Sequence, residues 1–221
     1  MTEPVKSSAA DYPRRRARAR ATRARILKSA RDLFLERGYV ATSINAIAER
    51  ADVAPETIYS TFGTKRALLA EVVDVAIAGD ADAPPVMEQA WVADLRAEPD
   101  VRRRLAILTS NGAALLARRA DLDAVVSAAA ASDPDIATLR DTGKAQRLAG
   151  QRALLGMVIG SSRLRDGLDL DAAADTLYAV GSPETYQLLV IDRGWTTERF
   201  ARWYAETLER LLLAHGPESG R

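Results

Sequence analysis

A short stretch of side chains between positions 55 and 65 has the composition of a surface that contacts a nucleic acid. The hydroxyl groups of Thr57 and Tyr59 donate hydrogen bonds well to phosphate oxygens, and Lys65 adds a positive charge. Glu56 carries acceptor oxygens that suit the amino group of a cytosine. We therefore predict phosphate contacts from Tyr59 and Lys65, and base contacts from four residues of the same stretch, Pro55, Glu56, Thr57 and Ser60.

These side chains must be held in place by a rigid element, and the residues just before them have the pattern of a helix followed by a tight turn. Residues 44–51 carry apolar side chains at helical spacing, and Ser43 or Thr42 can cap that helix with a side-chain oxygen. Asp52 tolerates the left-handed backbone of a tight turn, and a proline heads the second segment, 55–62. Helices this short are not stable alone, so the pair reads as a helix-turn-helix. Thr42 and Ser43, at its beginning, join the predicted DNA contacts.

Charge is distributed unevenly along the chain and supports the same interpretation. Residues 1–66 hold 14 Lys and Arg against 7 Asp and Glu, whereas residues 67–221 hold 17 against 23. Much of the excess lies in an arginine-rich run before the first helix that includes Arg16, Arg18 and Arg20. Such a run suits phosphate binding or insertion into the minor groove, and the alternative is a disordered solubilising tail. Beside a helix-turn-helix we favour the DNA contact.

The spacing of these features resembles a known family. The matching residues are Phe34, Arg37, Gly38, Tyr39, Thr42, Ser43, Ile47, Ala48, Ala51, Val53, Thr57, Tyr59, Phe62, Lys65, Leu68 and Leu69. In order and spacing they resemble the DNA-binding domain of the tetracycline-repressor (TetR) family, over about residues 20 to 75. The resemblance implies a dimeric transcription regulator with a three-helix operator-binding domain and a larger domain that binds a small molecule and dimerises. Two positions depart from the family, which often has Gly at Asp52 and a Ser or Thr cap at Ala54.

The remaining composition argues against catalysis and metal binding. There is no cysteine, and the single histidine, His215, lies in a Gly- and Pro-containing end. No apolar run reaches the roughly 18 residues that a bilayer span needs, and the N-terminus lacks the apolar core of a signal peptide. We expect no catalytic residue, no metal, no cofactor and no membrane association, and a cytoplasmic location.

The helical pattern continues to the end of the chain and predicts an all-α fold. A first helix is expected from about 22 to 37, and separate helices at 100–119 and 121–131. Asp133 should cap a long helix that Pro134 begins. The expected division is a basic flexible arm, a helix-turn-helix domain, a helical effector-binding and dimerisation domain and a tail, at residues 1–20, 21–65, 66–214 and 215–221.

The last two helical segments carry a broad apolar stripe, which is core or a contact between subunits. Gly181-Ser182-Pro183 should break the first of the two. This pair resembles the family's dimerisation helices, so we predict a homodimer through one set of residues, Leu188, Leu189, Phe200, Trp203, Tyr204, Leu208 and Leu211.

The function that follows is a DNA-binding transcriptional regulator, expected to be a repressor that a small-molecule effector releases from a palindromic operator. The effector is expected to be largely apolar, and the pattern assigns no residue to its site. A different class stays open: a helical small-molecule carrier or enzyme with a vestigial DNA-binding motif. Loss of DNA binding with rising salt would separate a regulator from a carrier.

Overall fold

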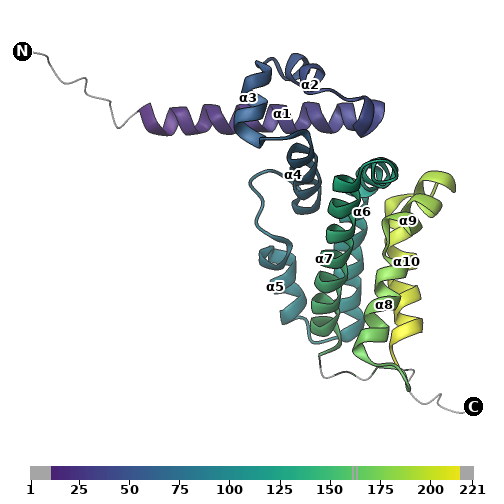
Figure 1. Ribbon diagram of the computed structural model, residues 1–221. Helices are drawn as coiled ribbons and strands as arrows, with labels where there is room; N and C mark the ends of the chain where they lie inside the picture. Colours follow the sequence, from purple (N-terminus) through teal and green to yellow (C-terminus); the bar gives the residue numbers. More distant parts are fainter. Residues whose placement is uncertain (1–10, 161, 163, 215–221) are drawn as a thin grey trace, which may run out of the picture. The chain divides into compact units, whose positions relative to one another are not determined.

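The computed structural model describes residues 11–160, 162 and 164–214, and there the predicted all-α fold is confirmed (Figure 1). Its regular elements are helices, with one isolated β-bridge between Leu164 and Leu213. The helices are α1 (Asp11–Ala41), α2 (Ile44–Ala51), α3 (Pro55–Phe62), α4 (Lys65–Ala78), the 3-10 turn η1 (Val86–Glu88), α5 (Ala90–Ala97), α6 (Val101–Ala130), α7 (Pro134–Ile159), α8 (Leu170–Val180), α9 (Pro183–Tyr186), the π-helical turn η2 (Gln187–Asp192) and α10 (Thr197–Leu212).

The chain divides into two compact units, residues 1–72 and 73–221. The boundary lies inside α4, whereas the sequence suggested a boundary after residue 65. In the N-terminal unit, α1, α2, α3 and the first part of α4 share one small apolar core. Its fully buried members include Ile26, Leu33, Phe34, Ile47, Ile58, Leu68 and Leu69.

Side-chain caps place the starts of the helices where the sequence predicted them. The Asp133 carboxylate accepts from the backbone N–H groups of Asp135 and Ile136 at the start of α7. The predicted break at Gly181-Ser182-Pro183 is also confirmed, because α8 ends at Val180 and Ser182 caps α9. These caps fix where α7 and α9 begin, and with them the frame of the second unit.

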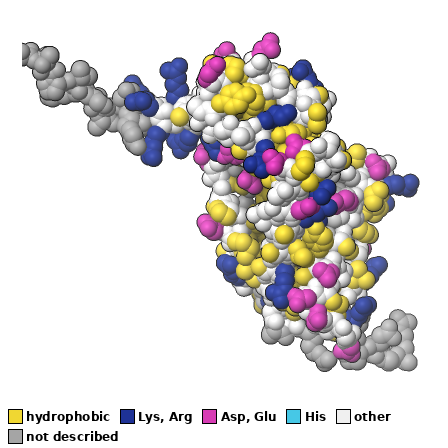
Figure 2. Space-filling model, in the orientation of Figure 1, with side chains coloured by type: hydrophobic (Ala, Val, Ile, Leu, Met, Phe, Trp, Pro, Cys, Tyr) yellow, Lys and Arg dark blue, Asp and Glu magenta, His cyan; other side chains and the backbone are white. Residues whose placement is uncertain are grey.

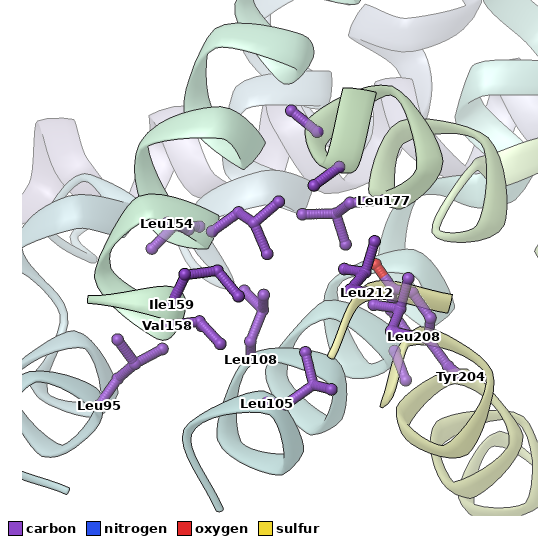
Figure 3. Close-up of a cluster of buried hydrophobic side chains, with 14 of the residues drawn as sticks. Leu95, Leu105, Leu108, Leu154, Val158, Ile159, Leu177, Tyr204, Leu208 and Leu212 are labelled. Carbon is purple, nitrogen blue, oxygen red and sulfur yellow. The ribbon is translucent and has the colours of Figure 1, made fainter. Parts of the chain in front are cut away.

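The C-terminal unit is a helical bundle built around α6 (Figure 1). Helices α7 and α10 both pack on α6, and α8 packs on α7. Figure 3 shows the apolar centre of this bundle, where side chains such as Leu108, Leu154 and Leu177 meet residues of α10. The core therefore draws on helices that are distant in the sequence.

Helix α6 is continuous, so the expectation of separate helices at 100–119 and 121–131 is wrong. The intervening stretch contains no glycine or proline that would stop a helix. Arg119 and Asp123, four residues apart, instead pair across the expected break with Nη2 and Oδ1 2.7 Å apart.

Candidate nucleic-acid interface

The corner between α2 and α3 has the geometry that the sequence predicted. Ser43 Oγ accepts from the Ala46 N–H at 3.1 Å and so caps α2. Asp52 adopts the left-handed conformation, with φ 51° and ψ 56°. The next N–H, of Val53, donates to the Ala48 carbonyl at 3.0 Å and closes the turn. The helix-turn-helix is therefore held by its own backbone and one side-chain cap.

Helix α3 presents the predicted polar face away from the core. Ile58 and Phe62 are buried, whereas Tyr59 is 54% exposed and Glu56 is exposed. Pro55 and Thr57, at the start of the helix, are half-buried. The helix has no side-chain cap at Ala54, as the departure from the family pattern implied. A tyrosine ring and a carboxylate thus stand on the outer side of a fixed helix.

Two hydroxyl groups on this face already donate within the helix. Ser60 Oγ and Thr61 Oγ1 donate to the Thr57 carbonyl at 3.0 and 2.6 Å. A hydroxyl has one proton, so in this arrangement Ser60 is left with acceptor capacity towards a base.

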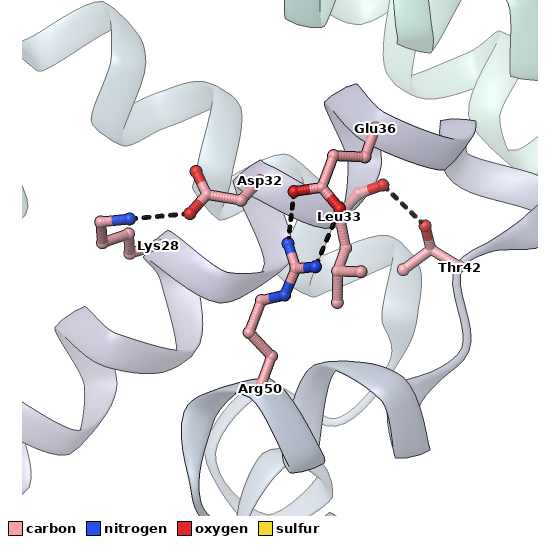
Figure 4. Close-up of polar contacts among 6 residues, drawn as sticks. All are labelled: Lys28, Asp32, Leu33, Glu36, Thr42 and Arg50. Atoms are coloured by element: carbon pink, nitrogen blue, oxygen red, sulfur yellow. Dashed lines mark hydrogen bonds and ion pairs between the residues drawn. The ribbon is translucent and has the colours of Figure 1, made fainter.

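Thr42 must be removed from the predicted DNA contacts. Its side chain is 1% exposed, and Oγ1 lies 3.1 Å from the Leu33 carbonyl (Figure 4). The same oxygen lies 2.7 Å from the Gly38 carbonyl. Gly38, with φ 77°, breaks the helical geometry of α1, and Thr42 ties the chain back to that helix just after the break. Ser43 remains exposed and acts as the α2 cap.

Lys65 has an internal role that the sequence did not reveal. Its ammonium donates to the carbonyls of Tyr39 and Thr42, both at 2.9 Å, and lies 4.2 Å from the centre of the Tyr39 ring. Lys65 therefore connects the start of α4 to the last turn of α1 and to Thr42, which follows that helix. Its contact with phosphate remains a prediction.

An exposed ion pair connects α1 and α2. Arg50 Nη1 and Nη2 donate to the two carboxylate oxygens of Glu36 at 2.6 and 2.8 Å (Figure 4). The hydrogen bond from Arg50 lowers the pKa of Glu36. Figure 4 also shows Lys28 paired with Asp32 at 2.7 Å, one turn earlier in α1. The Arg50–Glu36 pair therefore links α2 to α1 at the surface, whereas the Lys28–Asp32 pair lies within α1.

The predicted flexible arm is wrong for residues 11–20, because α1 already begins at Asp11; residues 1–10 lie outside the described part of the chain. Alanines and arginines dominate this segment, and both residue types favour helix. Residues Arg14 to Arg20 are exposed, and Figure 2 shows basic side chains gathered over the start of α1.

An open hollow joins the arginines of α1 to the polar face of α3. Its lining contains six residues of α1 and two of α3, namely Arg15, Arg18, Ala19, Arg20, Thr22, Arg23, Thr57 and Thr61. Of the three predicted arm residues, Arg18 and Arg20 line the hollow and Arg16 does not. Arg15 and Arg23 belong to the same arginine-rich run and also line the hollow, although they were not among the residues named as DNA contacts. We define this surface, the hollow together with the outer face of α3, as the basic face.

The predicted dimer residues divide into two sets. Phe200, Tyr204 and Leu208 are buried in the protein's own core, so their assignment to a contact between subunits is wrong. They occupy the face of α10 that packs on α6. The surface set is Leu188 and Leu211, at 59% and 38% exposed, with Leu189 and Trp203 half-buried.

The described residues contain no group of three or more His, Cys, Asp or Glu side chains that could hold a metal ion. They also contain no helix that is long and apolar enough to cross a membrane. His215 and the predicted tail lie outside the described residues.

Comparisons with known proteins agree with this geometry. Residues 26–72 match the family model for bacterial regulatory proteins of the tetR family. The HTH-type transcriptional regulator YdeS of Bacillus subtilis is 29% identical over 178 residues, which are 80% of this chain and 83% of YdeS. The family match thus covers the helix-turn-helix, and the likeness to YdeS extends into the second unit.

Solved structures share the helical fold over most of this chain. The transcriptional regulator FadR of Bacillus subtilis, in complex with stearoyl-CoA, has a TM-score of 0.66 at 22% identity, over 83% of this chain and 96% of FadR. A regulator from Saccharomonospora viridis in complex with choline has a TM-score of 0.64 at 23% identity, over 87% of this chain and 98% of that protein. At these identities the likeness shows a common fold.

Proposed function

We propose that this chain, a transcriptional regulator whose DNA-binding domain belongs to the tetR family, is a repressor that leaves a palindromic operator when a small molecule binds. The observation that carries the proposal is the basic face, where arginines of α1 and the polar side of α3 share one hollow. A duplex supplies phosphates to such arginines and base edges to such a helix. We place the protein in the cytoplasm and assign it no enzymatic activity.

On this proposal, α3 is the recognition helix. Pro55, Glu56 and Thr57 are at its N-terminal end, the end that enters the major groove in helix-turn-helix proteins. Glu56 accepts from a cytosine amino group, and Tyr59, one turn later, donates to a phosphate. Arg15 and Arg18 bind the phosphates beside the same groove.

A homodimer follows from the operator chemistry. One short helix reads too few base pairs to select a site, and two copies read a palindrome with two-fold symmetry. The exposed apolar side chains of η2 and α10 supply the contact between subunits, with Leu188, Ile191 and Leu211 at its centre.

Release by an effector is a shift between two conformations of the dimer. A ligand that binds the conformation with misplaced α3 helices more tightly weakens operator binding by that difference in free energy. The complexes of similarly folded regulators with stearoyl-CoA and with choline support control of this chain by a small-molecule effector. Stearoyl-CoA is an anion and choline is a cation, so the two complexes together favour neither charge for the effector of this chain.

The test is a mobility shift of the full chain with DNA from upstream of its own gene and with sites selected from random duplexes. We expect one selected palindrome and an affinity that falls steeply as salt rises. A carrier or enzyme with a vestigial motif gives neither, and enrichment of no site would overturn the proposal.

A further inference from the structure

Two neighbouring side chains of α7 have buried polar atoms without hydrogen-bond partners. These atoms are Nη1 of Arg147, a donor, and Oε1 of Gln151, an acceptor. The residues are four apart, so they lie on the same side of the helix. Buried polar groups are normally paired, so a donor and an acceptor buried on the same side of one helix mark a place where a polar ligand could bind.

The surroundings of these atoms come from four helices. The Arg147 guanidinium lies 3.9 Å from the centre of the Tyr178 ring of α8. Gln151 Nε2 reaches the carbonyl of Gly181, at the end of α8, at 3.5 Å. Tyr204 of α10 packs directly on Gly181, so that a Cβ atom at position 181 would overlap the Tyr204 hydroxyl. The Tyr204 ring also packs against Gly112 of α6, where a Cβ atom would lie 3.4 Å from the ring.

The cluster is positively charged. The ion pairs among the described residues leave Arg147 without a carboxylate partner. Burial raises the pKa of the Tyr204 hydroxyl, and the charge of Arg147 acts in the opposite direction. The Arg147 charge therefore reaches the interior of the bundle, where an anion would neutralise it.

We propose that Arg147, Gln151, Tyr178 and Tyr204 form the headgroup site of the effector, and that the effector is an organic anion with an apolar body. This inference rests on the proposed function. A carboxylate or phosphate oxygen accepts from Arg147 Nη1, and a hydroxyl or a bound water of the ligand donates to Gln151 Oε1. The apolar body packs on the adjoining core, to which Tyr204, Leu154 and Leu177 belong (Figure 3).

The test uses four probes that share one alkyl chain: decanoate, decyl phosphate, decanol and decyltrimethylammonium. Binding to the full-length protein is measured by calorimetry below the micelle concentration. We expect decanoate or decyl phosphate to bind more tightly than decanol, and the cation to bind most weakly. The tighter of the two anions assigns the headgroup.

Variants of α7 test the residue assignment. Arg147→Met should weaken binding of the preferred anion about tenfold to a hundredfold, because a hydrogen bond to a charged group is lost, and should leave decanol binding unchanged. Lys144→Met removes a positive charge from an exposed position of the same helix and should bind the anion as the wild type does.

A second variant keeps the inference testable if Arg147→Met fails to fold. Gln151→Glu places a carboxylate one turn from Arg147, so it should pair with Arg147, raise the unfolding midpoint and prevent anion binding. Anion binding by Gln151→Glu equal to that of the wild type would overturn the proposal.

The outcomes separate this inference from the proposed function. Failure of both anions to bind the wild-type protein, or equal affinity in Arg147→Met, rejects the anion site and leaves water as the partner of these atoms. If the wild-type protein still binds its operator, only this inference falls. Absence of specific DNA binding rejects the proposed function itself.

Discussion

At the scale of single residues, Glu56 and Tyr59 occupy the same exposed helix but have different chemistry. Glu56 is in the first turn of α3, and an ionised carboxylate accepts hydrogen bonds but donates none. It therefore reads a donor such as the cytosine amino group and is repelled by phosphate. Tyr59 donates from a hydroxyl at the end of a rigid ring and suits a phosphate of any sequence.

Glu56→Ala is expected to change base preference at one position of the operator by about 1 to 3 kcal/mol. Tyr59→Phe is expected to weaken binding to all duplexes alike, by about 1 kcal/mol. Selection from random DNA followed by titration measures both. Glu49→Ala removes an exposed carboxylate from α2 and is the matched control, whose preference should stay that of the wild type. A wild-type preference in Glu56→Ala would remove Glu56 from base reading.

The buried Thr42 stabilises the fold, so its replacement should lower the stability of the protein and leave its DNA specificity unchanged. Thr42→Val keeps the shape but removes the hydroxyl that bonds the α1 carbonyls, which should lower the free energy of unfolding by about 1 kcal/mol. Urea denaturation measures this. Thr61→Val makes the same change at an exposed position and should be nearly neutral. Equal stability of Thr42→Val and Thr61→Val would contradict a stabilising hydrogen bond from the Thr42 hydroxyl to α1.

At the scale of elements, the start of α1 matters because it is helical. A helix sorts its arginines by face: Arg15 and Arg18 line the hollow with α3, whereas Arg14 and Arg16 do not. A flexible arm would make all four equivalent. Because this segment is helical, we expect the arginines on the face of α1 that lines the hollow to bind phosphate more strongly than those on the other faces.

Replacing Arg15 and Arg18 together with Gln should weaken binding to all duplexes and reduce the slope of log affinity against log salt by about 2, one per lost phosphate contact. Replacing Arg14 and Arg16 with Gln removes the same charge and should have a smaller effect on both quantities. Mobility shifts at several salt concentrations provide the comparison. Equal losses in the two double variants would favour a flexible arm.

Local chemistry explains which elements were predictable from the sequence. Caps and turns depend on neighbouring residues, so Ser43, Asp52, Pro55 and Asp133 marked helix ends that the structure confirms. The start of α1 and the continuity of α6 were not predicted, because the arginine-rich residues 14–20 were interpreted as a flexible arm and the polar stretch in mid-α6 as a break between two helices.

The candidate sites show the same limit. Residue types identified the outer face of α3, but burial removed Thr42 and internal hydrogen bonds engaged Lys65. The apolar stripe of α10 was recognised from its spacing. Spacing alone does not tell which side of the stripe the protein's own α6 covers.

At the scale of the whole molecule, a regulator of a palindrome needs two recognition helices at a fixed separation. That separation depends on the contact between subunits, which we place on the exposed side chains of η2 and α10. Leu188 and Ile191 are 59% and 58% exposed on the π-helical turn, where large apolar side chains are costly in water unless another surface covers them. The inner face of α10 already has its partner within the chain.

This division predicts opposite results for two similar substitutions. Leu188→Glu places a charge at the contact between subunits, twice per dimer because of the two-fold symmetry, and should give a folded monomer with much weaker operator binding. Leu208→Glu places the charge in the protein's own core beside α6, and should unfold the C-terminal unit. Sedimentation measures the mass of each variant, and circular dichroism during heating measures its folding. A Leu188→Glu protein that remains a dimer with normal operator affinity would move the contact away from η2, because a buried charge at a symmetric interface cannot leave dimerisation unchanged.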